Sequence, residues 1–321
     1  MPRHFLIAGL AAVATIAGTA AASAADVILV GKASATTFAF APLEIGTAKG
    51  IWAKYGLIVQ SIGFGGDARL QQAMVANSID FALGSGPGMG FLVKGVPAIA
   101  VAAMANEPLS MGLTIGNPSP IKKTEDLKGA VVSVSTAGSL TMWLAREFSR
   151  QMGWGPEGMR TVPLGVNQAQ VAALRSGQVQ GFVASSSLGY ALEKAGSGRV
   201  LVEFGKYVKD FHTHVIFATK EIVTHHPDQV RRFLAGWREV IDFMAANRDE
   251  TIRLVAPISG LPEDIQAREY DESMPMMSRD LKFRPKALEV LARSLVELEI
   301  LPSPPDMKAL YTEQFLPPAR Q

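Results

Sequence analysis

The chain of 321 residues contains no cysteine. This absence excludes disulfide bonds, thiolate metal sites, cysteine nucleophiles and a lipid-modified cysteine at the start of a mature protein. A cysteine-free exported protein is compatible with a bacterial periplasm, although the composition alone does not require that compartment.

The sequence also lacks tracts of one charge. Its 31 basic and 29 acidic residues give a net charge of +2. No basic run suggests nucleic-acid binding, and no acidic tail suggests a sink for cations. No Gly-x-Ser-x-Gly elbow, phosphate-binding loop or His-Glu-x-x-His motif occurs. We therefore expect a protein that is not an enzyme, does not bind nucleic acid and needs no cofactor.

Long apolar runs are missing except at the N-terminus. A short basic start precedes the apolar run 5–17, and Ala22-Ser23-Ala24 has the small-x-small pattern of a signal-peptidase site. We expect residues 1–24 to be a cleaved signal peptide, with an uncleaved membrane anchor as the alternative. No later segment approaches the roughly 20 apolar residues of a membrane-spanning helix, so we expect a soluble protein of the periplasm.

The rest of the chain alternates short apolar runs with segments of helical spacing, and a Gly or small polar residue follows each expected strand. This order predicts an α/β fold of parallel sheets flanked by helices. About 300 residues are more than one core usually serves, so we expect two lobes. The expected strands are 27–30, 57–64, 79–83, 96–104, 131–134, 161–164, 182–184 and 215–219. The expected helices are 43–49, 51–55, 68–76, 140–152, 168–176, 228–247 and 287–298, and we expect the last two to cover the first lobe.

The two halves contain a weak internal repeat. ARLQQAMVANSIDFALGS begins at Ala68 and AQVAALRSGQVQGFVASS begins at Ala169. Both run helix, turn, strand and small polar exit, and Ser85 falls opposite Ser186. Identity is too low to separate duplication from chance resemblance, but the shared order predicts two similar lobes facing each other.

Small polar residues gather where the expected strands end. In open parallel sheets, ligands bind beyond the carboxyl ends of the strands, where helix N-termini offer unpaired N–H groups. Glycine lets a ligand approach the backbone, and hydroxyl groups both donate and accept. Ordinary turn chemistry also favours such residues. The predicted ligand-binding residues are Thr37, Phe38, Gly66, Asp67, Ser85, Gly86, Thr136, Gly138, Ser139, Asn167, Ser185 and His214.

Three of these residues allow a second interpretation. Asp67 is placed to cap a helix, but if it faces the cleft it would favour a cationic or amine-bearing ligand. His212 and His214 lie on one face of a strand and could seat zinc, but no third ligand is apparent, so we expect no metal. His214 then has either a structural role or a ligand contact near the hinge. Phe38 stacks on a flat ligand or packs in the core.

Several segments, taken together, resemble one family of transport proteins. They are APLEIGTAKGIWAKYGL, GFGG and ANSIDFALGS in the first half, IKKTEDLKGAVVSVSTAGS and ALRSGQVQGFVAS in the second, and ATKEIVTHHPDQVRRFLAGW near the returning strand. In order and spacing they resemble the solute-binding proteins of ABC importers of the nitrate/sulfonate/taurine type. That family also contains binders of thiamine-pyrimidine precursors.

The resemblance implies a two-lobed, type II-like periplasmic-binding-protein fold with two crossovers at a hinge, near 113–117 and 214–219. Lobe 1 is then 25–113 plus 218–321, and lobe 2 is 114–217. It further implies a monomer that closes over a small organic molecule or oxyanion, such as a sulfonate, nitrate, carboxylate or pyrimidine. The closed form would dock on the permease and ATPase subunits of an importer. Two alternatives stay open: a sensory module that docks on a membrane receptor, and an enzyme of thiamine-pyrimidine metabolism, although the cysteine-rich iron motif of such relatives is missing.

Overall fold

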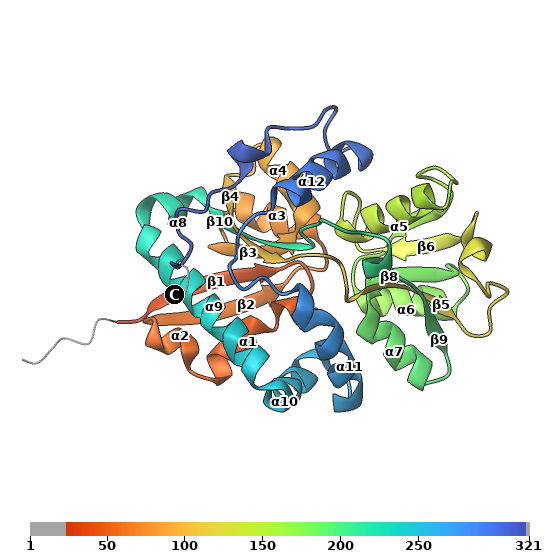
Figure 1. The fold of residues 1–321 in the computed structure, drawn as a ribbon, viewed down its shortest axis with the longest axis horizontal. Helices are drawn as coiled ribbons and strands as arrows, with labels where there is room; N and C mark the ends of the chain where they lie inside the picture. The colour runs from red at the N-terminus through yellow and green to blue at the C-terminus, as the bar shows by residue number, and fades with distance from the viewer. Residues whose placement is uncertain (1–23, 319–321) are drawn as a thin grey trace, which may run out of the picture.

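Two five-stranded sheets with helices packed around them make up the protein (Figure 1). The computed structural model describes residues 24–318. The expected signal peptide, apart from Ala24, lies outside the described residues. Within residues 24–318, no helix has both the length and the apolar character that a membrane crossing requires.

The first sheet has the order β2-β1-β3-β10-β4. Strands β1, β2 and β3 are parallel, and β10 runs antiparallel to both of its neighbours. The strands are β1 (Asp26–Lys32), β2 (Leu57–Gly63), β3 (Phe81–Ser85), β4 (Ala98–Ala105) and β10 (His214–Thr219). The helical segments between the first four strands are η1 (Phe38–Phe40), α1 (Pro42–Ala48), α2 (Ile51–Lys54), α3 (Asp67–Val75), η2 (Gly86–Gly88) and α4 (Met89–Val93).

The second sheet repeats this arrangement with the order β7-β6-β8-β5-β9. Strands β6, β7 and β8 are parallel, and β5 runs antiparallel to β8 and β9. The strands are β5 (Met111–Gly116), β6 (Val131–Val134), β7 (Arg160–Pro163), β8 (Gly181–Ser185) and β9 (Gly198–Glu203). The helical segments that accompany them are η3 (Thr124–Leu127), α5 (Leu140–Gln151), α6 (Asn167–Arg175), α7 (Ser186–Lys194) and η4 (Phe204–Lys206). The predicted fold class, an α/β protein built from two similar halves, is confirmed.

The chain passes between the sheets twice. It leaves the first sheet after β4, enters the second at β5 through residues 106–110, and returns from β9 to β10 through residues 204–213. The expected crossovers near 113–117 and 214–219 therefore fall inside β5 and β10 rather than between the sheets. Both connections contain polar residues, such as Asn106, Lys206 and Asp210, so the polar breaks that mark the change of sheet lie before β5 and β10 rather than within them.

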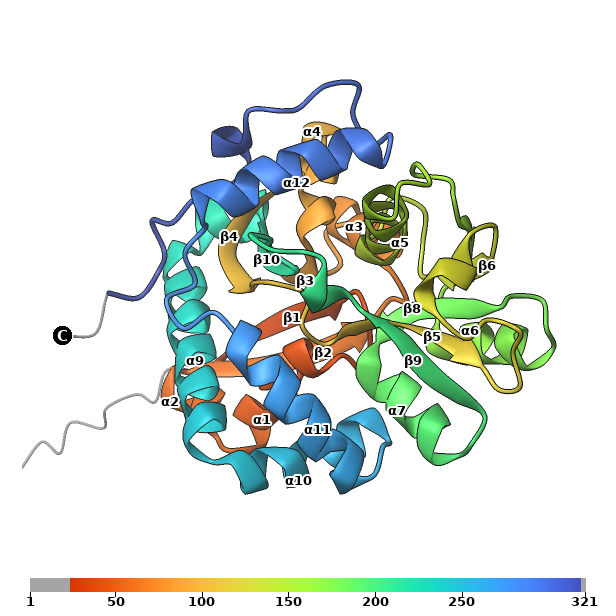
Figure 2. The same ribbon diagram turned by 45° about the vertical axis from the view of Figure 1, so that its right-hand side comes forward.

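The C-terminal helices contact both halves rather than the first alone (Figure 2). Helix α9 packs on α1, but α11 packs against α7 of the second half. The Tyr190 hydroxyl of α7 donates to the Glu272 carboxylate of α11 at 2.7 Å. The segments are α8 (Lys220–His225), α9 (Pro227–Ala246), α10 (Arg248–Ser259), α11 (Glu263–Ser273), η5 (Met274–Met276), α12 (Pro285–Glu297) and η6 (Met307–Leu310). The tail thus packs on the first half, as expected, and it also reaches the second half.

Trp52 of α2 organises the core beneath α9. Its indole is 2% exposed, stacks on Phe233 with ring centroids 5.3 Å apart, and donates Nε1–H to the Leu43 carbonyl at 2.8 Å. Two helical glycines leave room for the ring, since an added Cβ would lie 2.5 Å from it at Gly46 and 2.8 Å from it at Gly236.

We expect Gly236→Ala to lower the free energy of unfolding by about 1–3 kcal/mol, because overpacking against Trp52 outweighs the gain in helix propensity of roughly 1 kcal/mol. Urea unfolding measures the change. Adding Trp52→Phe should recover part of the loss in a double-mutant cycle. A Gly236→Ala variant as stable as the parent would contradict this packing.

Candidate functional site

A cavity of about 80 Å³ lies between the two halves, where strands of both sheets end. Neither sheet alone could form it. Its lining residues are Ala33, Ser34, Thr37, Phe40, Gly66, Asp67, Ser85, Met111, Ser135, Leu140, Thr141, Asn167, Gln170, Val183, Ala184, Ser185 and His214. We call this the inner cavity.

A larger cavity of about 320 Å³, the outer cavity, adjoins the inner one and shares Asn167 and Ser185 with it. The other lining residues come from α6, α7, the loop before η1 and the end of α10, and they are Thr36, Gln168, Val171, Ala172, Arg175, Ser187, Leu188, Ser259 and Leu261. The two cavities together form the cleft.

The structure brings most of the predicted binding residues to the inner cavity. Those that line it are Thr37, Gly66, Asp67, Ser85, Asn167, Ser185 and His214. They come from strand-exit loops, helix starts and the first residue of β10, which is where parallel sheets place ligands. Their contact with a ligand stays a prediction.

Other predicted residues lie outside the cavity lining. Phe38 is 1% exposed and packs edge-on against Tyr270 in the core. Gly86 lies against the His212 carbonyl, and Gly138 faces Ile300.

Ser139 is the N-cap of α5 and accepts a hydrogen bond from the Met142 N–H, which is its structural role. Thr136 lies across the cleft from Gly66 rather than on the cavity wall. Neither side chain lines the inner cavity, and a ligand contact at Thr136 or Ser139 stays a prediction.

Phe40 and Gln170 also line the cavity and are not among the predicted binding residues. Phe40 lies two residues after Phe38 in η1, and sequence spacing does not show which ring faces the cleft. Gln170 follows Asn167 by three residues in α6, so its position on the same helix face was the available signal.

Asp67 is the first residue of α3, and Gly66 rather than Asp67 is the N-cap. The expected capping role is therefore wrong. The Asp67 carboxylate instead accepts hydrogen bonds from the Ser85 N–H and the Ser85 hydroxyl, each at 2.8 Å, and so ties α3 to the end of β3. Burial raises the pKa of Asp67, and the two bonds from Ser85 oppose that rise.

His214 and Gln170 are buried polar side chains that lack protein partners. They are 5% and 1% exposed. Among the described residues, no well-formed hydrogen bond is made by either ring nitrogen of His214. The same holds for the Gln170 Oε1. Burial lowers the pKa of His214 to about 4, against a backbone contact with Gly84, so the ring is neutral at pH 7. A buried polar atom left unpaired costs about 1–3 kcal/mol, so these atoms point to a ligand that supplies their partners.

Glu269 of α11, in the C-terminal tail, contacts Ser185 of the cleft wall. It is 1% exposed and accepts a hydrogen bond from the Ser185 hydroxyl at 2.5 Å. Burial raises the pKa of Glu269 to about 7, and hydrogen bonds from Ser185 and Ser187 limit the rise. No sequence pattern marked this residue, because α11 has several other carboxylates that lie at its surface.

The two halves touch directly beside the inner cavity. A Cβ added at Gly66 would lie 2.4 Å from the Thr136 Cγ2, and one added at Gly65 would lie 2.8 Å from the Val166 Cγ1. Only glycine permits this approach, since both positions also have a positive φ. The two halves are therefore packed tightly against each other beside the inner cavity.

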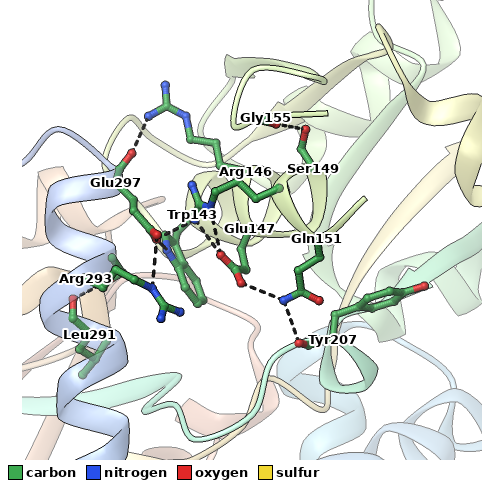
Figure 3. Close-up of polar contacts among 12 residues, drawn as sticks. Trp143, Arg146, Glu147, Ser149, Gln151, Gly155, Tyr207, Leu291, Arg293 and Glu297 are labelled. Atoms are coloured by element: carbon green, nitrogen blue, oxygen red, sulfur yellow. Dashed lines mark hydrogen bonds and ion pairs between the residues drawn. The ribbon is translucent and has the colours of Figure 1, made fainter. Parts of the chain in front are cut away.

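A polar cluster makes a second contact between the halves (Figure 3). Glu297, at the end of α12, accepts hydrogen bonds from the Trp143 Nε1–H at 2.8 Å and from Arg150 at 2.6 Å. The backbone carbonyl of Glu297 also accepts from Arg146 at 3.2 Å. Trp143 in turn stacks on Phe211 of the returning crossover, with centroids 4.4 Å apart. Helix α5 is thus attached to both α12 and the second crossover.

Comparison with known proteins agrees with this geometry. Residues 37–251 match the family described as NMT1/THI5 like. The chain belongs to this family. By sequence, no curated protein matches it.

Solved structures similar to this NMT1/THI5-like protein share its fold at low sequence identity. The alkanesulfonate-binding protein SsuA from Xanthomonas axonopodis pv. citri, bound to MOPS, has a TM-score of 0.78 and 16% identity over 89% of this chain and 98% of its own. SsuA from Escherichia coli has a TM-score of 0.73 and 18% identity over 92% and 95%. The nitrate-binding protein NrtA from Synechocystis PCC 6803 has a TM-score of 0.72 and 18% identity over 90% and 86%. The resemblance drawn from the sequence and the periplasmic-binding-protein fold are confirmed.

We expect the protein to lose stability as the pH falls from about 6.5 towards 4. Burial holds the pKa of His212 and of His214 at about 4, below the ordinary value of 6.5, so the unfolded chain takes up protons first. Each histidine contributes on the order of 3 kcal/mol above pH 6.5 that is lost across this window. Urea unfolding of the parent and of His214→Gln between pH 7 and pH 4.5 measures the effect.

The His214→Gln variant should lose less stability than the parent across that range. Glu269 acts in the opposite sense, because its raised pKa makes its contribution fall as the pH rises from 4.5 through 7. This contribution is present in both proteins and cancels in the difference. Equal pH slopes in the two proteins would contradict the buried neutral state of His214.

Proposed function

We propose that the protein is the periplasmic solute-binding component of an ABC importer, and that it closes over a small solute and presents the closed form to a membrane permease. The orphaned polar atoms of His214 and Gln170, which line a cavity that both halves build, carry this proposal. The named functions of the structural neighbours, sulfonate and nitrate binding, support it.

The moving units would be the two sheets with their helices, joined at residues 106–110 and 204–213. A solute bonded to both halves favours the closed state, because in the open state it bonds to one half only. The contacts of α11 with α7 and of Glu297 with α5 would form as the halves meet, and so would add to closure.

The cleft is better suited to binding than to catalysis. Ser85, Asp67 and His214 are the residue types of a hydrolytic triad, and all three line the inner cavity. Their contacts differ from a triad, in which the histidine joins the serine to the carboxylate. Here Asp67 bonds directly to Ser85, and neither His214 nitrogen makes a well-formed hydrogen bond among the described residues.

We expect a thermal-shift screen of sulfonates, nitrate, carboxylates, pyrimidines and amines to give a solute that raises the melting temperature. Gln170→Leu should abolish that shift without lowering the melting temperature of the free protein, because it removes a buried Oε1 that has no partner among the described residues.

Gln71→Leu is the matched control for this substitution. Gln71 is a buried helical glutamine, 2% exposed, whose amide atoms also lack partners among the described residues, but it lies off the cavity wall. Gln71→Leu should therefore keep the full shift. Loss of the shift in both variants, or in neither, would contradict the assigned site. Chemical conversion of the solute by the protein would overturn the binding function.

We expect Gly66→Ala to weaken solute binding by about tenfold or more, because its Cβ would lie 2.4 Å from the Thr136 methyl in the arrangement of the halves seen here, which we take to be the closed one. Thr136→Ser removes that methyl, so the double variant should regain part of the affinity. Isothermal titration calorimetry with the solute from the screen gives the affinities. Equal affinities for Gly66→Ala with and without Thr136→Ser would show that closure does not depend on this contact.

A further inference from the structure

Three side chains of the inner cavity present hydrogen-bond acceptors to it, and they are Ser85, Ser185 and Gln170. The Ser85 hydroxyl donates its proton to the Asp67 carboxylate, and the Ser185 hydroxyl donates its proton to Glu269. Both serines therefore offer lone pairs to the cavity rather than O–H groups. The Gln170 Oε1 adds a further acceptor. Gln170 is 1% exposed, and its Oε1 has no partner among the described residues.

The charge of the inner cavity has one sign. Asp67 is the charged residue among those that line it, and no lysine or arginine does so. Asp67 is 4% exposed, and its bonding partner, Ser85, is neutral. A buried carboxylate without a cation is costly, and a bound cation with well-formed hydrogen bonds offsets part of that cost.

An anion would be repelled by the Asp67 carboxylate at the start of α3. Nitrate and sulfonate groups only accept hydrogen bonds, and the N-terminus of α3, which would otherwise attract an anion, carries the Asp67 carboxylate as its first residue. Neutral His214 adds no positive charge at pH 7.

We propose that the cleft takes a small solute with a protonated amine or amidinium group, bound at Asp67 and the surrounding acceptors, rather than a sulfonate or nitrate. This inference rests on the proposed function and names its substrate class. The inner cavity of about 80 Å³ holds the cationic group, and the outer cavity of about 320 Å³ holds the rest of the solute. Arg175, exposed at the outer cavity, would form an ion pair with an anionic group at the other end of the solute, so a zwitterion also fits.

Matched pairs of solutes with the same skeleton test this class. The pairs are butylamine with butanesulfonate and benzamidine with benzenesulfonate, and ethanolamine and nitrate extend the series. Thermal shift and calorimetry on the parent protein should detect the cation of each pair and not the anion. This comparison needs no variant, so it stands even if a substitution disturbs folding.

Asp67→Asn keeps the shape of the side chain and removes its charge, and should weaken binding of the cation by about tenfold or more. Asp80→Asn is the matched control, because Asp80 is also a carboxylate whose pKa burial raises, and it accepts from the Leu29 N–H at 2.7 Å away from the cleft. Asp80→Asn should bind the cation as the parent does.

If the parent protein binds the sulfonates or nitrate, and Asp67→Asn binds them with an affinity equal to or higher than that of the parent, the substrate class is overturned. The proposed function stays in place. Binding of the cations with no loss in Asp67→Asn would also overturn the class, because Asp67 would then not be the recognising group. Failure of all members of both series to bind would overturn the class and the binding function together.

Discussion

The insertion of β10 between β3 and β4 is the constraint on which the cleft depends. β10 returns to the first sheet antiparallel, with His214 as its first residue and Ser85 as the paired residue of β3. This register places the histidine next to the serine that holds Asp67. A shift of one residue would turn His214 to the opposite face of the sheet. The second half repeats the device, since β5 enters between β8 and β9 and brings Met111 opposite Ser185.

Much of the fold was predictable because local patterns are strong in this chain. Every expected strand and helix occurs with its bounds within two residues, because β-branched runs, helix caps and glycine turns mark them. What the sequence missed lacks such marks. Helix α11 carries charged residues around most of its surface rather than an apolar stripe, since part of it faces α7. Strand β9 is an edge strand that pairs on one side only, and most of its residues are only partly buried.

The site was predictable at the level of loops and less so at the level of side chains. Strand exits and helix starts located Asp67, Ser85, Asn167 and Ser185 at the cavity. The same reasoning selected Ser139, whose hydroxyl caps α5 instead. Whether a small polar residue faces a ligand or its own backbone depends on rotamers and on packing from distant segments. Glu269 shows this, because it comes from a helix far along the chain and fixes the Ser185 hydroxyl.

The connectivity also determines how far apart in the sequence the paired strands of each sheet lie. The second sheet is built from one continuous stretch, from Met111 to Glu203, whereas the first sheet is interrupted by that stretch. β3 ends at Ser85 and its partner β10 begins at His214, so the first sheet closes a far longer loop than any pairing in the second sheet. Pairings of high sequence separation cost more chain entropy and form more slowly. The second half thus resembles a domain inserted into the first. The pairing of β10 with β3 and β4 requires that the inserted segment bring residues 105 and 214 close together.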